Sequence, residues 1–374
     1  MLQQSFFRVG IIFLTGFLLA GIVGCPPGAQ EGRVKGKNEK KVIAVIPKGA
    51  THNFWKSVEA GVRKAAEEND VEIIWKAPLL EDDRASQIME LENMITRGVD
   101  GIAIAPLDAH ALKKPIAEAA VNSGIPVILF DSDLDKEGGK KHIGLVATDN
   151  FVGGKQAADE MARLLHNKGK VAVLRYQVGS RSTEEREEGF LQQLKQYPEI
   201  EVISSEFYAG ATIETAKQKA ESLINLLAHE DKIDVDGFFA PNESSGQGML
   251  RALETTGFAG KVKFVTFDTA DALMSGLLDL KIDALVAQRP VYMGYKTIQL
   301  LSKKLRGDEI PEFFDTGSKI ITIQNYSEPD TQAIINALKN LDDAVKDFDA
   351  NPKTGSNDGN NPPSDQMPSD TKEM

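Results

Sequence analysis

Short apolar runs rich in β-branched residues alternate with amphipathic helical patterns over residues 42–348. Such runs fit strands that are buried on both faces, and their strict alternation with helices predicts parallel sheets covered on both sides. The series is too long for one ordinary sheet, so we expect an α/β protein with two doubly wound lobes that divide near residues 147–150. Strands are expected at 42–46, 71–75, 101–105, 126–130, 142–146, 170–175, 202–205, 237–240, 262–267, 284–287 and 320–323. Helices are expected from Phe54 onward and at 84–97, 109–123, 151–166, 183–196, 212–227, 244–255, 271–278, 292–305 and 328–348.

The N-terminal end carries a targeting signal. Residues 9–23 form an apolar run that is too short for a comfortable membrane span and ends just before Cys25. Small residues directly before the only cysteine resemble the lipobox of bacterial lipoproteins. We therefore predict a signal peptide at 1–24 and a lipid anchor on Cys25 that holds the protein to a membrane. The alternative is an ordinary secretory peptide with a chance cysteine.

The segments next to both ends lack the pattern of a packed core. Residues 25–40 have almost nothing to bury and are expected to form a tether. Residues 327–349 carry one more amphipathic helical pattern, and 350–374 are rich in Pro, Asn, Asp, Ser and Gly, which predicts a disordered tail.

Composition excludes several classes of protein. The net charge of −12 argues against nucleic acid as a partner and fits a soluble exported protein. A single cysteine allows no intrachain disulfide and no paired-cysteine zinc site. The histidines show no metal-ligand spacing, and no nucleophile, metalloprotease or phosphate-binding motif follows any predicted strand. We expect no enzyme activity, no metal and no cofactor.

The loop between the first predicted strand and its helix is the most informative segment. It presents Lys48, His52 and Asn53, followed by Phe54 and Trp55. Such loops lie at the carboxyl edge of an α/β sheet, where ligands bind. Polar groups beside aromatic faces suit a neutral polyhydroxylated ligand. Phe54 is in register with the helix core and on that pattern alone favours a core position, whereas Trp55 lies about a hundred degrees away and is expected at the surface or on a ligand.

Polar residues also follow several other predicted strands, where they would converge on one cleft if the lobes faced each other. The candidates are Asp131, Ser132, Arg186, Asn242, Asp268 and Gln288. Carboxylates and amides accept hydrogen bonds from sugar hydroxyls, and an arginine donates to them.

Structural roles compete with these assignments. Asn242 and Asp149 could serve only as helix N-caps. Ser182 and Glu185 form a capping-box pattern, and Arg186 could pair with a neighbouring glutamate on the surface. If Arg186 is buried, we expect it to contact Asp131 or Asp268 as well as ligand, because a buried charge needs partners.

These residues, in this order, resemble the ribose/galactose class of periplasmic sugar-binding proteins, the type I receptors of ABC importers. The resemblance covers about residues 41–324 and rests on the following motifs: Phe54-Trp55, Gly98 to Ile102, Gly124 to Val127, Asp131, Thr148 to Asn150 with Gly153-Gly154, Arg186 with Gly189-Phe190, Asn242, Phe267-Asp268 and Ala287-Gln288. It implies that Phe54 and Trp55 pack on a sugar ring and that Asp131, Arg186, Asn242, Asp268 and Gln288 bind its hydroxyls. His52 and Ser132, at positions where this chain departs from the ribose pattern, complete the predicted site and put ribose itself in doubt.

The resemblance also implies two lobes that close like a hinge crossed three times by the chain. The N-terminal lobe would comprise 41–147 and 289–318, and the C-terminal lobe 148–288 and 319–326. The implied function is capture of a monosaccharide or polyol for an importer permease, by a monomer in the periplasm or cell envelope. A receptor that presents its ligand to a chemotaxis or sensor protein is an alternative, and an exported sugar-processing enzyme is a second one.

Overall fold

The structure, a computed structural model, describes residues 40–135, 142–230 and 232–350. The predicted signal peptide, Cys25, most of the tether and the tail beyond residue 350 lie outside the described residues. Within the part of the chain that the structure describes, none of the helices combines the length and hydrophobicity that a membrane span requires.

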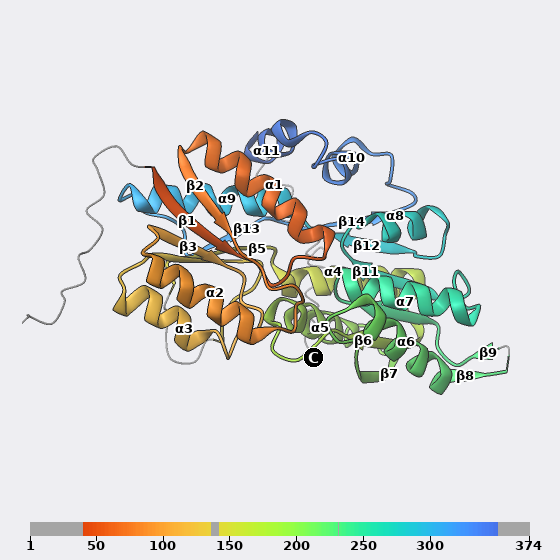
Figure 1. The fold of residues 1–374 in the computed structure, drawn as a ribbon. Helices are drawn as coiled ribbons and strands as arrows, with labels where there is room; N and C mark the ends of the chain where they lie inside the picture. The colour runs from red at the N-terminus through yellow and green to blue at the C-terminus, as the bar shows by residue number, and fades with distance from the viewer. Residues whose placement is uncertain (1–39, 136–141, 231, 351–374) are drawn as a thin grey trace, which may run out of the picture. The chain divides into compact units, whose positions relative to one another are not determined.

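Six parallel strands form the first sheet of the described residues, in the order β13-β5-β4-β3-β1-β2. They are β1 (Lys41–Ile46), β2 (Val71–Trp75), β3 (Gly101–Ile104), β4 (Val127–Phe130), β5 (Gly144–Ala147) and β13 (Phe313–Asp315). Apolar side chains of α1 (Asn53–Glu68) and α9 (Pro290–Leu305) pack on one face. Helices α2 (Arg84–Arg97) and α3 (Lys113–Ala117) lie on the other face, as Figure 1 shows, and their apolar side chains pack against it. We call this sheet and its helices the N-terminal lobe.

The second sheet has the order β14-β12-β11-β10-β6-β7 among the described residues. Its strands are β6 (Lys168–Arg175), β7 (Glu199–Tyr208), β10 (Gly237–Ala240), β11 (Lys263–Phe267), β12 (Ala284–Ala287) and β14 (Lys319–Thr322). One face is covered by α4 (Asn150–Leu164) and α5 (Arg181–Leu194). The other is covered by α6 (Ile213–Leu227), α7 (Glu243–Thr256) and α8 (Asp271–Leu278). We call this unit the C-terminal lobe.

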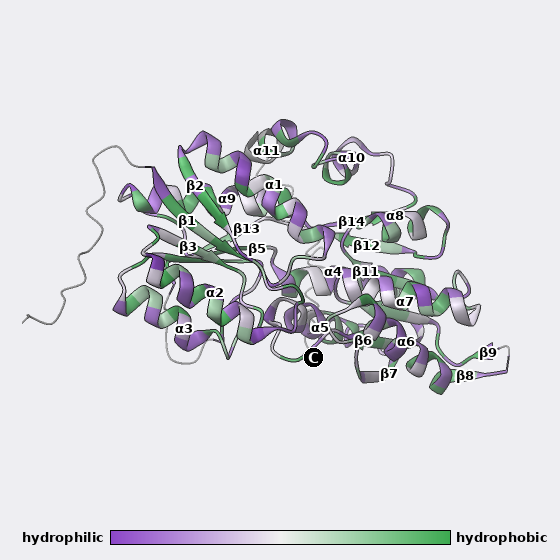
Figure 2. Ribbon diagram, viewed as in Figure 1, coloured by the Kyte–Doolittle hydropathy of each residue, from purple (hydrophilic) through white to green (hydrophobic). Residues whose placement is uncertain are grey.

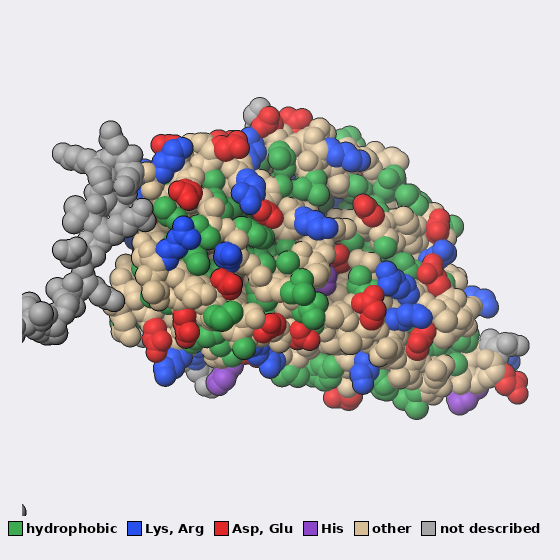
Figure 3. Space-filling view, in the orientation of Figure 1, with side chains coloured by type: hydrophobic (Ala, Val, Ile, Leu, Met, Phe, Trp, Pro, Cys, Tyr) green, Lys and Arg blue, Asp and Glu red, His purple; other side chains and the backbone are tan. Residues whose placement is uncertain are grey.

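The predicted α/β class with two sheets is confirmed. The central strands β3, β4, β10 and β12 are buried along their whole length, and green, hydrophobic residues recur in the strands of Figure 2. The chain passes from one sheet to the other after β5, after β12 and between β13 and β14. On the face shown in Figure 3, acidic and basic side chains are interspersed with apolar ones, so that face carries no extended basic field.

Five details differ from the expectations, three of them in the strands. The last strand, β14, runs antiparallel to β12, so the second sheet is not wholly parallel. The strand expected at 202–205 extends over the whole of β7, with register irregularities against β6. A short hairpin of β8 (Ala228–His229) and β9 (Lys232–Ile233) was not expected.

The helix expected at 109–123 begins only at Lys113 and continues as a π-helix, η1 (Glu118–Asn122). The reason lies in its sequence: the Asp108 carboxylate accepts hydrogen bonds from the backbone N–H groups of His110 and Ala111 and forms a turn there. Pro115, which has no N–H to donate, then falls in the first helical turn, where proline is tolerated.

The prediction of a single C-terminal helix at 327–349 is wrong, because the segment forms two helices, α10 (Pro329–Ile335) and α11 (Leu341–Ala350). The break spans Asn336 to Asn340, and asparagine favours helix ends and turns over helix interiors. The two helices also pack on different lobes: Ile334 belongs to the core of the C-terminal lobe and Val345 to that of the N-terminal lobe.

Candidate ligand-binding site

One small cavity of about 30 Å³ between the lobes gathers eight of the nine side chains predicted to bind ligand. They are His52, Phe54, Trp55, Asp131, Arg186, Asn242, Asp268 and Gln288. Ser132, the ninth, lies beside them, and its Oγ accepts a hydrogen bond of 3.0 Å from the backbone N–H of Ser182. All of these except Phe54 are buried, so most of the predicted polar residues lie in the interior. We call this region the cleft.

Asp131 and Asp268 occupy equivalent positions in the two lobes. Each directly follows a central strand, and each donates its backbone N–H to the adjacent strand, at 2.9 Å to Val146 and 3.0 Å to Val286. Both lie in the left-handed backbone region, with φ of 62° and 74°, which aspartate tolerates better than most residues. The two carboxylates therefore enter the cleft from opposite lobes, and burial raises the pKa of Asp268.

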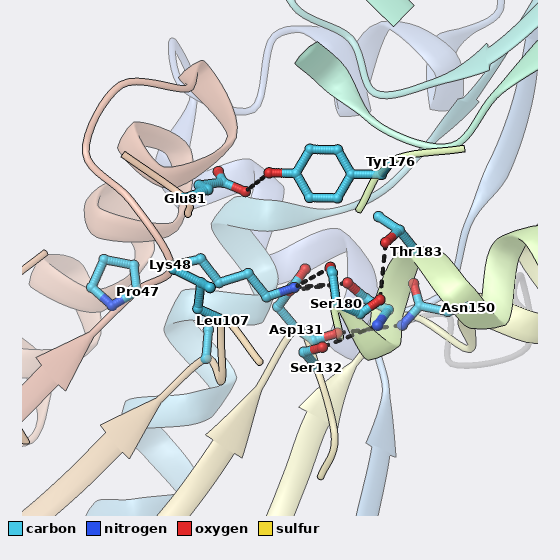
Figure 4. A network of polar contacts seen from close by, with 12 residues as sticks. Pro47, Lys48, Glu81, Leu107, Asp131, Ser132, Asn150, Tyr176, Ser180 and Thr183 are labelled. Carbon is cyan, nitrogen blue, oxygen red and sulfur yellow. Dashed lines mark hydrogen bonds and ion pairs between the residues drawn. The ribbon is translucent and has the colours of Figure 1, made fainter. Parts of the chain in front are cut away.

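Lys48 joins the two lobes through the cleft, although it was not in the predicted set. Its Nζ lies 2.7 Å from the Asp131 carboxylate and donates to Ser182 Oγ at 2.8 Å and Ser180 Oγ at 3.4 Å (Figure 4). The lysine and aspartate belong to the N-terminal lobe and the two serines to the C-terminal lobe. Ser180, not Ser182, occupies the N-cap position of α5, so the expected capping role of Ser182 is wrong.

Arg186 is buried and held by its own lobe. Its Nε donates to Asn150 Oδ1 and its Nη1 to the carbonyl oxygen of Pro241, each at 2.9 Å. The guanidinium also lies over the Phe267 ring, 4.5 Å from the centroid. These contacts fix the fork in one orientation, and burial lowers the pKa of Arg186 despite the nearby carboxylates of Asp268 and Asp131.

The alternative in which Arg186 pairs with a neighbouring glutamate on the surface is wrong, because Arg181 donates to Glu185 and Arg175 donates to Glu187. The expected contact with Asp131 or Asp268 is also absent among the described residues. An amide, a carbonyl and an aromatic ring replace it. Neutral acceptors take two of the arginine's N–H groups, and the aspartates have other partners: Lys48 pairs with Asp131, and Asp268 accepts from Gln288.

Two glycines allow α5, the helix that carries Arg186, to pack closely against α4. A Cβ on Gly154 would lie 2.1 Å from the carbonyl oxygen of Arg186, and one on Gly189 would lie 2.1 Å from that of Phe151. Only glycine permits this approach. The position of the arginine is thus set by the backbone packing of α4 and α5.

Glu81 is a functional candidate that the sequence reasoning missed. It is buried after β2, and its Oε1 lies 2.5 Å from both His52 Nδ1 and Trp55 Nε1. Its Oε2 accepts from the hydroxyl of Tyr176 at 2.9 Å, from the other lobe (Figure 4). Burial would raise the pKa of Glu81, but His52 outweighs it and holds the pKa at about 2. Burial likewise opposes the charged form of His52, yet Glu81 raises the pKa of that imidazole to about 9.

Glu243 makes a second bridge between the lobes. Its carboxylate oxygens accept from the backbone N–H groups of Asn53 and Phe54, at 3.1 and 3.0 Å. These are orphan donors of the first turn of α1, where the helix dipole favours an anion. Burial raises the pKa of Glu243.

Asn242 and Gln288 have different hydrogen-bonding states. Asn242 caps α7, because its Oδ1 accepts from the backbone N–H of Ser245 at 3.2 Å, and it lines the cleft as well. Asp149 caps α4 in the same way through Val152. The Nε2 of Gln288 donates to Asp268 at 2.7 Å, and its buried Oε1 has no partner among the described residues.

The two aromatic residues exchange their expected environments. Trp55 is 3 % exposed and packs in the core against Phe130, so the surface alternative is wrong, although one part of it lines the cleft. Phe54 is half-buried, lines the cleft and meets the Trp55 ring edge-on with centroids 4.9 Å apart. Both rings can therefore contact a ligand, with the indole held by its hydrogen bond to Glu81.

The two lobes together supply the cleft with buried carboxylates and amides, one arginine held in place, one lysine and two aromatic rings. No group of three or more His, Cys, Asp or Glu side chains in the described ranges is placed to hold a metal ion. The fold and the cleft together define a two-lobed α/β protein with a small, polar cavity between its lobes.

Comparison with known proteins assigns the family. Residues 43–309 match the periplasmic binding protein domain, so this chain belongs to that family. The ribose import binding protein RbsB of Bacillus subtilis is 27 % identical over 312 residues, which cover 83 % of this chain and 97 % of that protein. The family consists of substrate-binding proteins of the periplasm or cell envelope. Family membership thus confirms the predictions of a binding protein rather than an enzyme and of its location in that compartment.

Solved structures agree with this assignment. A carbohydrate transporter solute-binding protein from Agrobacterium radiobacter, in complex with D-arabinose, has a TM-score of 0.74 and 32 % identity, covering 79 % of this chain and 99 % of that one. An ABC transporter solute-binding protein from Agrobacterium vitis with bound D-fucose has a TM-score of 0.74 and 31 % identity, with the same coverage. The resemblance predicted from the sequence motifs is therefore confirmed.

Proposed function

We propose that this chain is the substrate-binding component of an ABC importer and captures a monosaccharide or related polyol in the cleft by closure of the lobes. The observation that carries the proposal is the meeting of Asp131, Arg186 and Asp268, from both lobes, beside aromatic rings in one buried cavity. Carboxylates accept from hydroxyls, the arginine donates to them, and ring faces cover the apolar side of a sugar. The relatives named above, which bind ribose, D-arabinose and D-fucose, support a sugar ligand.

We assign the N-terminal side of the ligand to His52, Phe54, Trp55, Asp131 and Ser132, and the C-terminal side to Arg186, Asn242, Asp268 and Gln288. In the present structure the lobes meet directly, because Lys48 reaches Ser180 and Ser182. A ligand would enter when the lobes separate and would then replace these contacts. The closed, ligand-bound protein would then dock on a membrane permease.

A thermal-shift screen of monosaccharides and polyols on the purified full chain tests the proposal. A ligand that binds only the folded state stabilises it by an amount that grows with ligand concentration, so we expect a dose-dependent rise in Tm for one sugar or a few related ones. Small-angle scattering should then show a more compact protein with that ligand than without it. A screen in which no sugar or polyol shifts Tm at millimolar concentration contradicts the proposed function.

We also propose that the chain is anchored to a membrane through a lipid on Cys25 and works as a monomer, since one chain supplies both walls of the cleft. With multiple acyl chains the protein should fractionate with membranes. The variant Cys25→Ser is expected to be released into the soluble fraction or to remain unprocessed, as judged by fractionation and intact mass. A Cys25→Ser protein that is processed and stays on the membrane as before refutes the anchor, and light scattering of the soluble form tests the monomer.

A further inference from the structure

A second cavity, of about 230 Å³, adjoins the cleft. We call it the side pocket. It shares four lining residues with the cleft, namely Phe54, Glu243, Asp268 and Gln288. The two cavities therefore meet at the polar residues that the proposed function assigns to the ligand. The cleft itself measures only about 30 Å³, so most of the free volume at this site lies in the side pocket.

The roof of the side pocket is the pair of C-terminal helices, α10 and α11, which lie along one side of the molecule in Figure 1. The first is held to the C-terminal lobe by Ile334 in its core and by an ion pair between Asp330 and Lys319. The second is held to the N-terminal lobe by Val345 and by an ion pair between Asp342 and Lys64. The roof is therefore attached to both lobes in this closed conformation.

Away from the cleft, the side pocket is lined by polar side chains on one part of its wall, namely Asn53, Lys56, Ser57, Thr269, Asp271 and Arg289, and by a continuous set of apolar residues on the part formed by α9 and the roof. The apolar residues include Val291, Tyr292, Ala333, Ile334, Leu338 and Ala344. Leu338 is 49 % exposed, which leaves apolar surface in contact with water at this cavity. At the junction with the cleft, the buried Oε1 of Gln288 has no hydrogen-bond partner among the described residues and remains available to a polar atom of the ligand. The combined site thus has polar groups in the cleft and an apolar surface under the roof of the side pocket.

We propose that the side pocket is an extension of the ligand site and receives an apolar alkyl or aryl group joined through oxygen to the bound sugar, so that the ligand class is a glycoside. The inference rests on the proposed function, because it places the sugar in the cleft. Removing an apolar group from water into this pocket is favourable in proportion to the area buried.

The test is isothermal titration calorimetry of the full chain with three series of compounds. They are D-ribose, D-arabinose and D-fucose, each as the free sugar, the methyl glycoside and the phenyl glycoside in both anomeric forms. For at least one sugar and anomer, we expect the phenyl glycoside to bind about ten-fold more tightly than the methyl glycoside, from the additional apolar area buried.

Two variants link that ratio to the side pocket. Ala333→Phe and Ala344→Phe each fill it from the roof and are expected to reduce the phenyl-to-methyl affinity ratio to one or below. Ala117→Phe adds the same bulk to a half-buried position on α3, which does not line the pocket, and should leave the ratio unchanged. The ratio is measured within each variant, so a general loss of stability does not imitate the effect.

The outcomes separate this inference from the proposed function. If free sugars bind but no phenyl glycoside binds more tightly than its methyl counterpart, the side-pocket inference is overturned and the proposed function stands. A phenyl preference that survives both roof variants overturns it as well, because the gain then arises elsewhere. If neither free sugars nor glycosides bind, the proposed function fails together with the inference.

Discussion

Replacement of Arg186 by alanine is expected to weaken binding of the ligand found in the screen by about 2–5 kcal/mol, or roughly 30- to 5,000-fold in Kd. The guanidinium is held by Asn150, Pro241 and the Phe267 ring before any ligand arrives, so little order remains to be gained on binding. Without it, Asp268 loses the positive charge that opposes the effect of its own burial. Calorimetric titration of the variant measures the loss.

Arg186→Lys tests whether ligand affinity depends on the planar guanidinium group or only on its positive charge. Lysine is a point charge and cannot satisfy Asn150 and the carbonyl of Pro241 in the same geometry, so we expect it to recover little of the loss. Arg163→Ala, which removes an exposed arginine paired with Glu160, should bind like the parent. An Arg186→Ala protein that is folded and binds as tightly as the parent shows that the site assignment is wrong, even though the fold is right.

The second large effect is on stability. Glu81→Ala is expected to lower the free energy of unfolding by about 3–5 kcal/mol, because it leaves the buried His52 cation without its counter-charge. It also removes the acceptor of the Trp55 indole N–H and the Tyr176 hydroxyl. Urea unfolding at pH 6 measures the loss. Asp82→Ala, at the exposed neighbouring position, is the matched control and should change the value by less than about 0.5 kcal/mol.

The same pair predicts how stability depends on pH. Folding raises the pKa of His52 from 6.5 to about 9. The protonated imidazole therefore contributes fully to the free energy of unfolding below pH 6.5, and this contribution is lost as the pH rises through about 9. Folding lowers the pKa of Glu81 from 4.5 to about 2, so its contribution is complete above pH 4.5 and is lost as the pH falls through about 2. Both contributions are complete between pH 4.5 and 6.5.

His52→Gln is expected to remove the fall in stability between pH 6.5 and 9, measured as the free energy of unfolding across a pH series. His110→Gln, at an exposed histidine, should leave that fall in place. A His52→Gln variant with the same slope as the parent in this window shows that another group carries the pH dependence. The glutamine can still donate to Glu81, which limits the accompanying loss of stability.

The candidate site was largely predictable from the order of residues after strands. Asp131 follows β4, Asp268 follows β11 and Gln288 follows β12, and the carboxyl ends of parallel strands lie at one edge of a sheet. The same rule could have found two residues that were missed. Glu81 lies in the loop after β2, and Tyr176 directly follows β6. Both lie at the same edges as the residues that were predicted.

Local periodicity could not decide the environments of Phe54 and Trp55. The helical repeat states that they lie about a hundred degrees apart, but the angular position of the core depends on which helix packs alongside. Here α9 packs closely on α1, and a Cβ on Gly294 would lie 2.1 Å from the carbonyl oxygen of Val58. That contact orients α1 so that Trp55 is buried and Phe54 is half-buried.

The sequence alone determined the α/β class, the presence of two sheets and most residues of the cleft, because alternation of strands and helices and the edge at which loops emerge are local properties of the chain. Only the tertiary structure decided the partners of those residues. Arg186 is satisfied by Asn150 and Pro241 instead of an aspartate, and Lys48 reaches across the cleft to serines more than a hundred positions away. Burial makes an unsatisfied charge costly, and which acceptors satisfy it depends on the packing of elements that are distant in the sequence.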